Sequence, residues 1–308
     1  MLDWEAAIHY ARMVQAAKNV MPTQECAPTL TVSLRGVPVQ YNVLATIYAN
    51  DLATRHNEGR RELIVSIGFI AQDEDGHVVI ALRGTRGIHE WIRDMLYFAV
   101  PCPFLPEAGC TEHGFTEVYM SLRMDTAHES KRLRRGISEM AFPLPVSSLT
   151  VCGHSLGAAL ATFLALDLAA NTQHKDVNLY NFASPRTGDH KFAETFNRFV
   201  PKAYRIVNQL DLVTDVPRSL LSHETKYRHV ESIAAVMPHD GVKQHLLCMH
   251  HLSTYTHLMA KEAGLNLDEY PLRKECRRET DNGWVRSLKR RARFGGKPEE
   301  KIKASLQQ

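Results

Sequence analysis

A serine stands between two glycines in the segment Gly153-His-Ser-Leu-Gly157. The preceding residues, Leu149-Thr-Val-Cys152, are typical of a short buried strand, and residues 153–170 predict a long apolar helix. A sharp corner between a strand and a helix strains the serine backbone, and glycines two residues away on either side avoid Cβ clashes there. This context predicts that Ser155 is a nucleophile whose hydroxyl stands clear of the sheet, rather than a plain helix N-cap, which is the alternative interpretation.

A serine hydroxyl is a weak nucleophile at neutral pH, so it needs a histidine to take its proton and a carboxylate to orient that histidine. For a nucleophile on such a corner, the acid and then the histidine follow along the chain. Asp211 comes just after a predicted strand and a short turn, with Asp215 and Asp189 as the alternatives. Seven histidines follow Asp211, and these are His223, His229, His239, His245, His250, His251 and His257.

Helices and strands are predicted to alternate along most of the chain. Apolar residues at helical spacing predict helices at residues 4–20, 41–55 and 116–141. Runs rich in β-branched residues predict strands at residues 63–70, 77–82, 149–152, 177–182 and 204–207. The first two strands flank the turn Asp73-Glu-Asp-Gly76, as in a hairpin. The alternation as a whole implies βαβ units, and therefore an α/β fold with a largely parallel sheet.

Seven segments occur in the same order as the motifs of the class 3 lipases, the fungal-type triacylglycerol lipase family, and the chain resembles that family over roughly residues 40–260. They are Ala81-Leu-Arg-Gly-Thr85, Trp91-Ile-Arg-Asp94, Glu112-His-Gly-Phe115, the segment around Ser155, Tyr180-Asn-Phe-Ala-Ser-Pro-Arg-Thr-Gly-Asp189, Asp211-Leu-Val-Thr-Asp-Val-Pro217 and His250-His-Leu-Ser-Thr-Tyr255. Leu82, Ala183 and Thr214 differ from the residues usual at those places, which indicates a distant branch.

The resemblance implies an α/β-hydrolase fold, with a mostly parallel central sheet flanked by helices and a lid helix. It implies hydrolysis of carboxylic esters, most of all acylglycerols, through a Ser-His-Asp triad and an acyl-enzyme, with no cofactor. It places the acid at Asp211. The family pattern His-x-Leu-x-x-Tyr selects His250 as the base, with Leu252 and Tyr255 in the required places. The neighbouring His251 would point elsewhere on any regular backbone.

Two further functional features follow from this fold. The residue after the nucleophile, Leu156, and a loop after an earlier strand supply the oxyanion donors. The resemblance assigns the second donor to Thr85, whereas a plain turn with Thr85 as a helix cap is the alternative. The apolar residues Ile88, Trp91 and Ile92 share one helical face, which is either a lid over the site or an ordinary core helix.

Other functions remain open at this stage. Within hydrolysis, a phospholipase A1 or an esterase of short-chain or aromatic acids would use the same chemistry. A different class is a non-catalytic scaffold that binds lipid on a hydrolase fold. The sequence argues against it, because a residue stands at each expected catalytic and oxyanion position. A metal site is not expected, because there is no His-Glu-x-x-His motif and no carboxylate spaced to complete a set of ligands.

Length and charge set the remaining expectations. The chain has 308 residues, of which 44% are hydrophobic, enough for one large core, and its net charge of +3 does not favour a polyanion binder. We expect a hydrolase domain at residues 1–270 and a basic tail or surface helix at 271–308. This tail could contact an anionic membrane or a nucleic acid, but no nucleic-acid function is expected. Oligomeric state stays open.

Cysteines and the N-terminus bear on the compartment. The six cysteines permit disulfides, and Cys102 and Cys110, which flank a Pro-rich loop, are the pair most easily bridged; free buried thiols are the equal alternative. The first residues lack the basic and apolar regions of a signal peptide. This pattern predicts a cytoplasmic protein, or a processed form of a secreted one.

Overall fold

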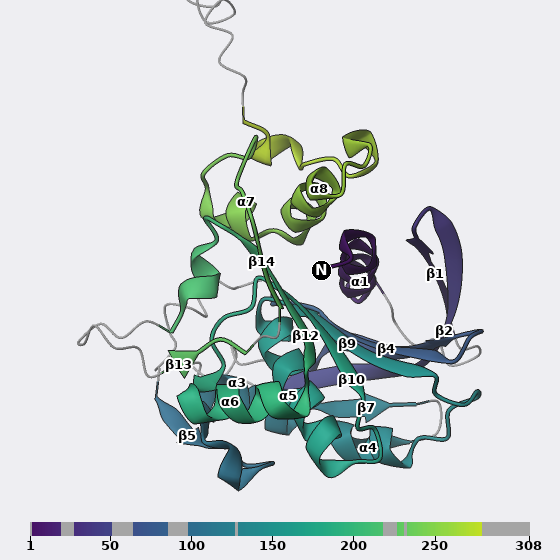
Figure 1. Cartoon of the computed structure of the whole chain (residues 1–308). Helices are drawn as coiled ribbons and strands as arrows, with labels where there is room; N and C mark the ends of the chain where they lie inside the picture. The colour runs from purple at the N-terminus through teal and green to yellow at the C-terminus, as the bar shows by residue number, and fades with distance from the viewer. Residues whose placement is uncertain are drawn as a thin grey trace, which may run out of the picture.

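Within the residues that the computed structural model describes, a ten-stranded mixed sheet runs through the middle of the molecule (Figure 1). Those residues are 2–19, 28–50, 64–85, 98–126, 129–217, 227–230 and 233–278. The strand order is β14-β12-β10-β9-β4-β3-β2-β7-β8, with β1 beside β2. Its strands are β1 (Thr29–Leu34), β2 (Val37–Asn50), β3 (Ile64–Asp73), β4 (His77–Leu82), β7 (Arg123–Asp125), β8 (Ser130–Arg132), β9 (Ser148–His154), β10 (Val177–Phe182), β12 (Lys202–Asn208) and β14 (Ile233–Met237).

One half of this sheet is parallel. The strands β4, β9, β10, β12 and β14 pair in parallel, whereas the remaining pairs are antiparallel. The carboxyl ends of parallel strands meet at one edge, where open α/β sheets place their sites. The predicted mixed sheet is confirmed, as is the β3–β4 hairpin through the turn at residues 73–76. A small second sheet contains β5 (Ala99–Pro101), β6 (Cys110–Glu112), β11 (Gly188–Asp189) and β13 (Tyr227–Arg228).

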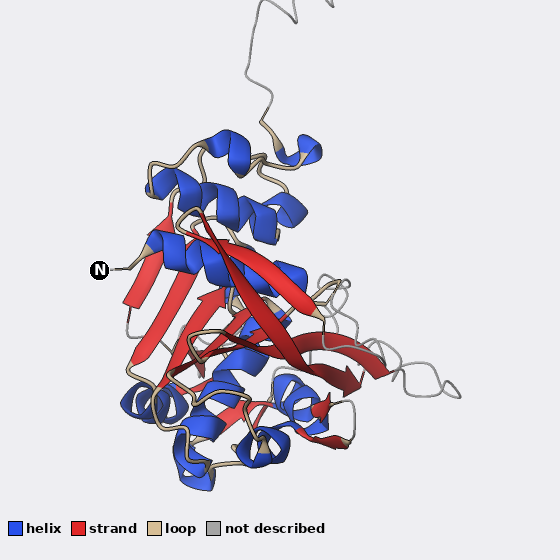
Figure 2. Cartoon of the chain, turned by 90° about the vertical axis from the view of Figure 1, so that its right-hand side faces the viewer, coloured by secondary structure: helices blue, strands red, loops and turns tan. Residues whose placement is uncertain are grey.

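Helices cover both faces of the large sheet (Figure 2). On one face, α1 (Trp4–Ala16) packs beside α8 (Leu252–Glu262). On the other face lie α3 (His113–Ser121), α4 (Leu133–Glu139), α5 (Leu156–Asn171) and α6 (His190–Phe199). Helix α5 is apolar all round, and every residue from Gly157 to Ala169 is buried, so it forms the centre of the core on that face.

The expected helix at residues 41–55 is wrong, because residues up to Asn50 belong to strand β2. Apolar residues four apart, such as Tyr41, Ala45 and Ala49, fit both a helical stripe and every second residue of a strand. The strand pairs with β1, β3 and β7, and these long-range hydrogen bonds decide between the two. The buried side chains accordingly alternate along it, and they include Tyr41, Val43, Ala45, Ile47 and Ala49.

The expected helix at residues 116–141 is also wrong as a continuous element. Helix α3 ends where Leu122 turns into an extended conformation, with φ −60° and ψ 130°. The antiparallel pair β7–β8 then extends the sheet beyond β2, and α4 follows. The helix at residues 4–20 is confirmed as α1, which ends at Ala16. None of the described helices has the length and apolar content that crossing a bilayer requires.

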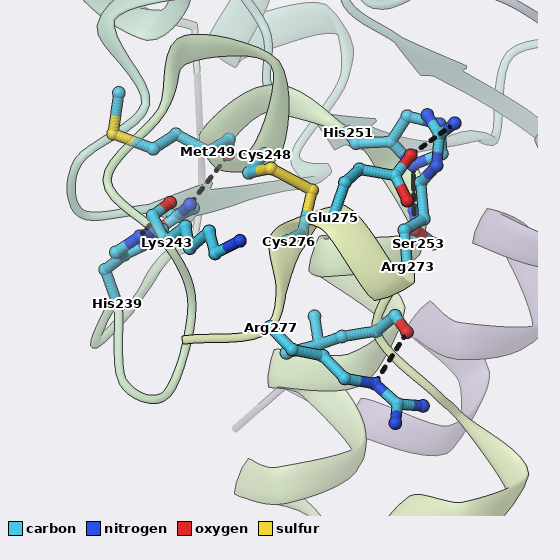
Figure 3. Close-up of a disulfide and its surroundings, with 12 residues drawn as sticks. His239, Lys243, Cys248, Met249, His251, Ser253, Arg273, Glu275, Cys276 and Arg277 are labelled. Atoms are coloured by element: carbon cyan, nitrogen blue, oxygen red, sulfur yellow. Dashed lines mark hydrogen bonds and ion pairs between the residues drawn. A yellow bond between two sulfur atoms is a disulfide. The ribbon is translucent and has the colours of Figure 1, made fainter. Parts of the chain in front are cut away.

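Of the two equal alternatives for Cys102 and Cys110, the structure has the free thiols and not the bridge. A disulfide joins Cys248 to Cys276, with their Cα atoms 5.2 Å apart (Figure 3). Cys102 and Cys110 are free thiols, as is the buried Cys152. The bridge ties the short helix α7 (Leu246–His250) to the last described turn of the chain, η5 (Lys274–Cys276). Residues 271–278 of the expected tail are described, and Leu272 and Cys276 are buried there. The basic residues 279–308 lie outside the described part, so the expected tail stays a prediction.

Candidate active site

Ser155 sits at the corner between β9 and α5. Its backbone has φ 60° and ψ −124°, a conformation that non-glycine residues rarely adopt. A Cβ added to Gly153 would lie 2.2 Å from the carbonyl oxygen of Gly157, and one added to Gly157 would lie 2.3 Å from that of Leu82. The two glycines are therefore required by the close approach of backbones. Ser155 occupies the N-cap position of α5, but its side chain makes no capping hydrogen bond.

Three residues far apart in the sequence meet at this corner. The Nε2 atom of His250 lies 2.8 Å from Oγ of Ser155, and its Nδ1 atom lies 2.8 Å from Oδ2 of Asp211. All three residues are buried. Because Asp211 can only accept, Nδ1 carries a proton and Nε2 is the acceptor for the serine hydroxyl. The arrangement can take a proton from Ser155 and stabilise the resulting imidazolium.

Asp211 follows strand β12 and caps the short helix η3 (Leu212–Asp215). Its Oδ1 atom accepts the backbone N–H of Val213 at 3.0 Å. Its Oδ2 atom accepts the hydroxyl of Tyr255 at 2.7 Å in addition to His250. Burial, followed by the charge of Asp211, raises the pKa of Tyr255 well above its usual range, so the hydroxyl keeps its proton and donates. The carboxylate is therefore held by three donors.

The rival acids have other partners. Asp215 is half exposed and lies 3.8 Å from the guanidinium of Arg186. Asp189 caps α6 by accepting the backbone N–H of Phe192 at 2.8 Å, and it also accepts that of Cys110 at 3.0 Å. Both carboxylates thus have structural contacts away from His250.

The rival histidines are also engaged elsewhere. His251 caps α8 and bonds Ser253, with 2.7 Å between its Nδ1 and the serine Oγ. His257 bonds the carbonyl of Tyr270 at 2.8 Å. Burial, then the charge of Arg205, lowers the pKa of His229 to about 3. Of the other three, His239 bonds Asn208, His245 precedes α7, and His223 lies outside the described residues.

The two segments that carry the expected oxyanion donors, the start of α5 and the loop after β4, lie beside Ser155. Leu156 is the first residue of α5, where the backbone N–H groups have no partner within the helix. On the other side, the loop after β4 passes so close that a Cβ on Gly84 would lie 3.0 Å from the Cβ of Ser155. Arg83 anchors this loop through Nε, 2.9 Å from the carbonyl of Ser66. Thr85 follows directly.

The expected lid lies outside the described residues, and two residues beside the base were not predicted. The lid residues Ile88, Trp91 and Ile92 belong to residues 86–97, which the structure does not describe. Within the described ranges, no group of His, Cys, Asp and Glu side chains is arranged to hold a metal ion. Neither His154 nor Asn208 was predicted to have a role, although His154 stands within the serine motif; His154 bonds the carbonyl of His250, and Asn208 bonds that of Met249.

Comparisons with known proteins bear on the family and the fold of the chain. Residues 79–220 match the model of the family described as Lipase (class 3). That stretch includes Thr85, Ser155 and Asp211, whereas His250 lies beyond it. Phospholipase A(1) DAD1, chloroplastic, from Arabidopsis thaliana is 30% identical in an alignment 195 residues long, and the match covers 56% of this chain and 42% of that protein. Phospholipase A1-II 7 from Oryza sativa subsp. indica is 31% identical in an alignment 214 residues long, and the match covers 61% of this chain and 52% of that protein.

Solved structures show the same fold. The native propeptide complex of Rhizomucor miehei lipase has a TM-score of 0.56 and 20% identity, covering 76% of this chain and 67% of that one. Lip2 lipase from Yarrowia lipolytica has a TM-score of 0.55 and 18% identity, covering 77% and 79%. The fold is therefore that of the α/β-hydrolases. Within that class, the segment that carries Ser155 and Asp211 belongs to the class 3 lipase family, which confirms the resemblance. The chain spans about half the length of the curated relatives it matches.

Proposed function

We propose that the protein is a serine hydrolase that cleaves the carboxylic esters of lipids. The observation that carries this proposal is the continuous hydrogen-bonded chain from Ser155 through His250 to Asp211, with 2.8 Å at each step. The family of the segment that contains Ser155 and Asp211 supports the same chemistry. The proposed catalytic residues are Ser155 as nucleophile, His250 as base and Asp211 as the acid that orients it.

In the proposed acylation step, His250 takes the proton of Ser155 through Nε2 while the serine Oγ bonds to the ester carbonyl carbon. The carbonyl π electrons move to oxygen and form a tetrahedral oxyanion. When this collapses, the bond to the alcohol oxygen breaks, and the imidazolium of His250 gives its proton to that oxygen. The products are an alcohol and an ester on Ser155.

Deacylation repeats these roles with water as the nucleophile. His250 takes a proton from water, the hydroxide oxygen bonds to the acyl carbon, and Ser155 leaves with the proton of His250. A free carboxylic acid is released and the enzyme is restored. Asp211 keeps the imidazole in one tautomer throughout, because Nδ1 stays bonded to Oδ2.

The proposed oxyanion donors are the backbone N–H groups of Leu156 and Thr85. The position of Leu156 at the start of α5, and the close contact of the Gly84 loop with Ser155, support this assignment. Donors of this kind stabilise charge that develops only in the transition state, and loss of one typically costs about 10²–10³ in kcat.

The proposed substrate class is an acylglycerol. The notable second candidate is a phospholipase A1 activity, which is favoured by the names of the relatives, phospholipases A1 together with the galactolipase DONGLE of Arabidopsis thaliana. A short-chain or aromatic-acid esterase remains the third. Contact with a lipid surface through Ile88, Trp91 and Ile92, and through the basic residues after 271, is part of this proposal. A non-catalytic lipid-binding scaffold is the alternative outside enzymes.

One panel of substrates tests the proposal. Initial rates are measured on p-nitrophenyl butyrate, p-nitrophenyl palmitate, triolein emulsion, phosphatidylcholine vesicles and monogalactosyldiacylglycerol micelles, with the Ser155→Ala variant as the control. We expect long acyl esters to exceed the butyrate, and all hydrolysis to vanish in the variant. Preference for phosphatidylcholine over triolein would select the second candidate, whereas preference for the galactolipid would indicate a galactolipase activity. No hydrolysis of any ester would favour the scaffold.

A further inference from the structure

The backbone of His250 lies at the junction between two helices, where one helix ends just before the next begins. Helix α7 ends at His250, and His251 turns into an extended conformation with φ −67° and ψ 134° before α8 begins. Carbonyl groups in the last turn of a helix have no partner within that helix. The carbonyls of Met249 and His250 therefore depend on donors from other elements.

Two side chains supply those donors. The Nε2 atom of His154 donates to the carbonyl of His250 at 2.8 Å, and the Nδ2 atom of Asn208 donates to that of Met249 at 2.7 Å. The amide of Asn208 is itself fixed, because its Oδ1 lies 3.0 Å from Nδ1 of His239. Two neighbouring carbonyls are thus each bonded by a side chain from a different strand end.

The origin of the donors matters as much as the bonds. His154 is the last residue of β9 and directly precedes Ser155, while Asn208 is the last residue of β12 and lies three residues before Asp211. The base is therefore tied to the element that presents the nucleophile and to the element that presents the acid. The residue before Met249, Cys248, is also tied, through its disulfide with Cys276 (Figure 3).

His154 is built to stay a neutral donor. A carbonyl oxygen can only accept, so the proton of His154 resides on Nε2. Burial first, and then the charge of His250, lower the pKa of His154 well below its usual range. Its ring also packs against the ring of His250, with 4.8 Å between centroids, and meets Tyr255 edge-on at 6.1 Å. The contact with His250 thus combines an N–H donor with an aromatic face.

We propose that His154 and Asn208 are positioning residues, which hold the backbone of the base so that its ring bridges Ser155 and Asp211. The proposal rests on the proposed function, since it assigns His250 as the base. Rates fall steeply when a reacting group moves by about an ångström, so loss of either bond acts on kcat rather than on substrate binding.

Two variants of His154 separate the N–H donor from the ring. His154→Phe keeps an aromatic ring and removes the donor, whereas His154→Gln removes the ring and keeps an amide N–H in the place of Nε2. His190→Leu is the matched control, since the side chain of His190 is 74% exposed and pairs with Glu194. The measurements are kcat and KM on p-nitrophenyl esters, the rate of labelling by a fluorophosphonate, and the melting temperature.

We expect His154→Phe to lower kcat about 10-fold with KM within about twofold, and His154→Gln to stay within about threefold of the parent. Labelling by the fluorophosphonate should slow in proportion to kcat, and the control should match the parent. Asn208→Leu gives a second comparison if His154→Phe does not fold, and the same split of kcat from KM is expected.

Three results would overturn the assignment: a kcat unchanged in folded His154→Phe and Asn208→Leu, an equal loss in His154→Phe and His154→Gln, or a loss confined to KM. The proposed function fails in a different way. In that case the parent protein hydrolyses none of the esters and Ser155 is not labelled, so the two failures are told apart by the parent alone.

Discussion

The hydroxyl of Tyr255 offers the sharpest single-atom test of how the acid is held. Tyr255 is fully buried, and its hydroxyl donates to Oδ2 of Asp211 at 2.7 Å, on the same oxygen that accepts from His250 at 2.8 Å. The side chain of Asp211 has 0% exposure, so water does not replace a lost donor. The change Tyr255→Phe removes one of the three donors and leaves the ring in place.

The magnitude follows from the charge of the acceptor. A hydrogen bond to a charged group contributes about 1.5–3 kcal/mol, and the free energy of unfolding should fall by that amount. If all of it served the transition state, kcat/KM would fall about 10- to 100-fold. Because the N–H of Val213 still holds Oδ1 at 3.0 Å, we expect a loss near the lower limit, about 10-fold.

The assay combines urea unfolding with steady-state kinetics on p-nitrophenyl esters. Tyr10→Phe is the matched control, because the hydroxyl of Tyr10 accepts a hydrogen bond from a neutral partner, Thr150, at 3.3 Å. The control should lose only about 0.5–1.5 kcal/mol of stability and keep its kcat. The reasoning is refuted if Tyr255→Phe matches the parent in both stability and kcat/KM, or if Tyr10→Phe loses as much activity.

Three further predictions concern the scaffold of the site. Burial raises the pKa of Glu112 to about 7 from a usual 4.5, so the folded state holds more protons than the unfolded one between these pH values and stability falls as pH rises through them. At about 1.36 kcal/mol per pKa unit, Glu112→Gln should remove roughly 3 kcal/mol of this fall. The same change in the free energy of unfolding between pH 5 and pH 8 in the parent and the variant, measured by urea unfolding, would contradict it. Replacing both Cys248 and Cys276 by serine should lower the free energy of unfolding by roughly 2–4 kcal/mol and lower the melting temperature. The melting temperature of this variant should no longer depend on dithiothreitol. A parent whose melting temperature is unchanged by the reductant after unfolding and refolding would contradict the disulfide. Gly157→Ala places a Cβ 2.3 Å from the carbonyl oxygen of Leu82, so circular dichroism should show loss of the fold or a melting temperature far below that of the parent, and a native melting curve would count against this corner.

The part of the site that could be predicted from sequence is the part set by local geometry. The strand, the two glycines and the apolar helix around Ser155 are neighbours in sequence, so their pattern specifies the corner without knowledge of the rest of the fold. The position of Asp211 just after a strand was likewise predictable, because the strand and the turn before Asp211 are its neighbours in sequence. Helix α5 and the parallel strands were predictable because their apolar runs are long and their turns short.

The remaining features depend on contacts between distant residues. Local spacing could not choose among seven histidines, and only the resemblance to a family singled out His250, whose bond to Ser155 spans 95 positions. Strand β2 was mistaken for a helix because its pairing partners lie in three other segments. The bridge from Cys248 to Cys276 joins residues 28 apart, and spacing does not specify which cysteines meet.

The roles of His154 and Asn208 were missed for a related reason. Each acts on a backbone carbonyl, and a carbonyl carries no mark in the sequence. The chain places His154 beside the nucleophile and Asn208 beside the acid, but nothing local shows that both bond the last turn of α7. Hydrogen bonds of this kind can be recognised only when the position of the helix end that needs donors is known.

The central claim is that Ser155 is a nucleophile activated by His250. Its most direct test is to treat the full chain with a fluorophosphonate and identify the modified residue by mass spectrometry of its peptides. The account predicts one adduct, on Ser155, that forms slowly in His250→Ala and is absent from Ser155→Ala. An adduct on another residue, or an unmodified Ser155 in the folded protein, would contradict it.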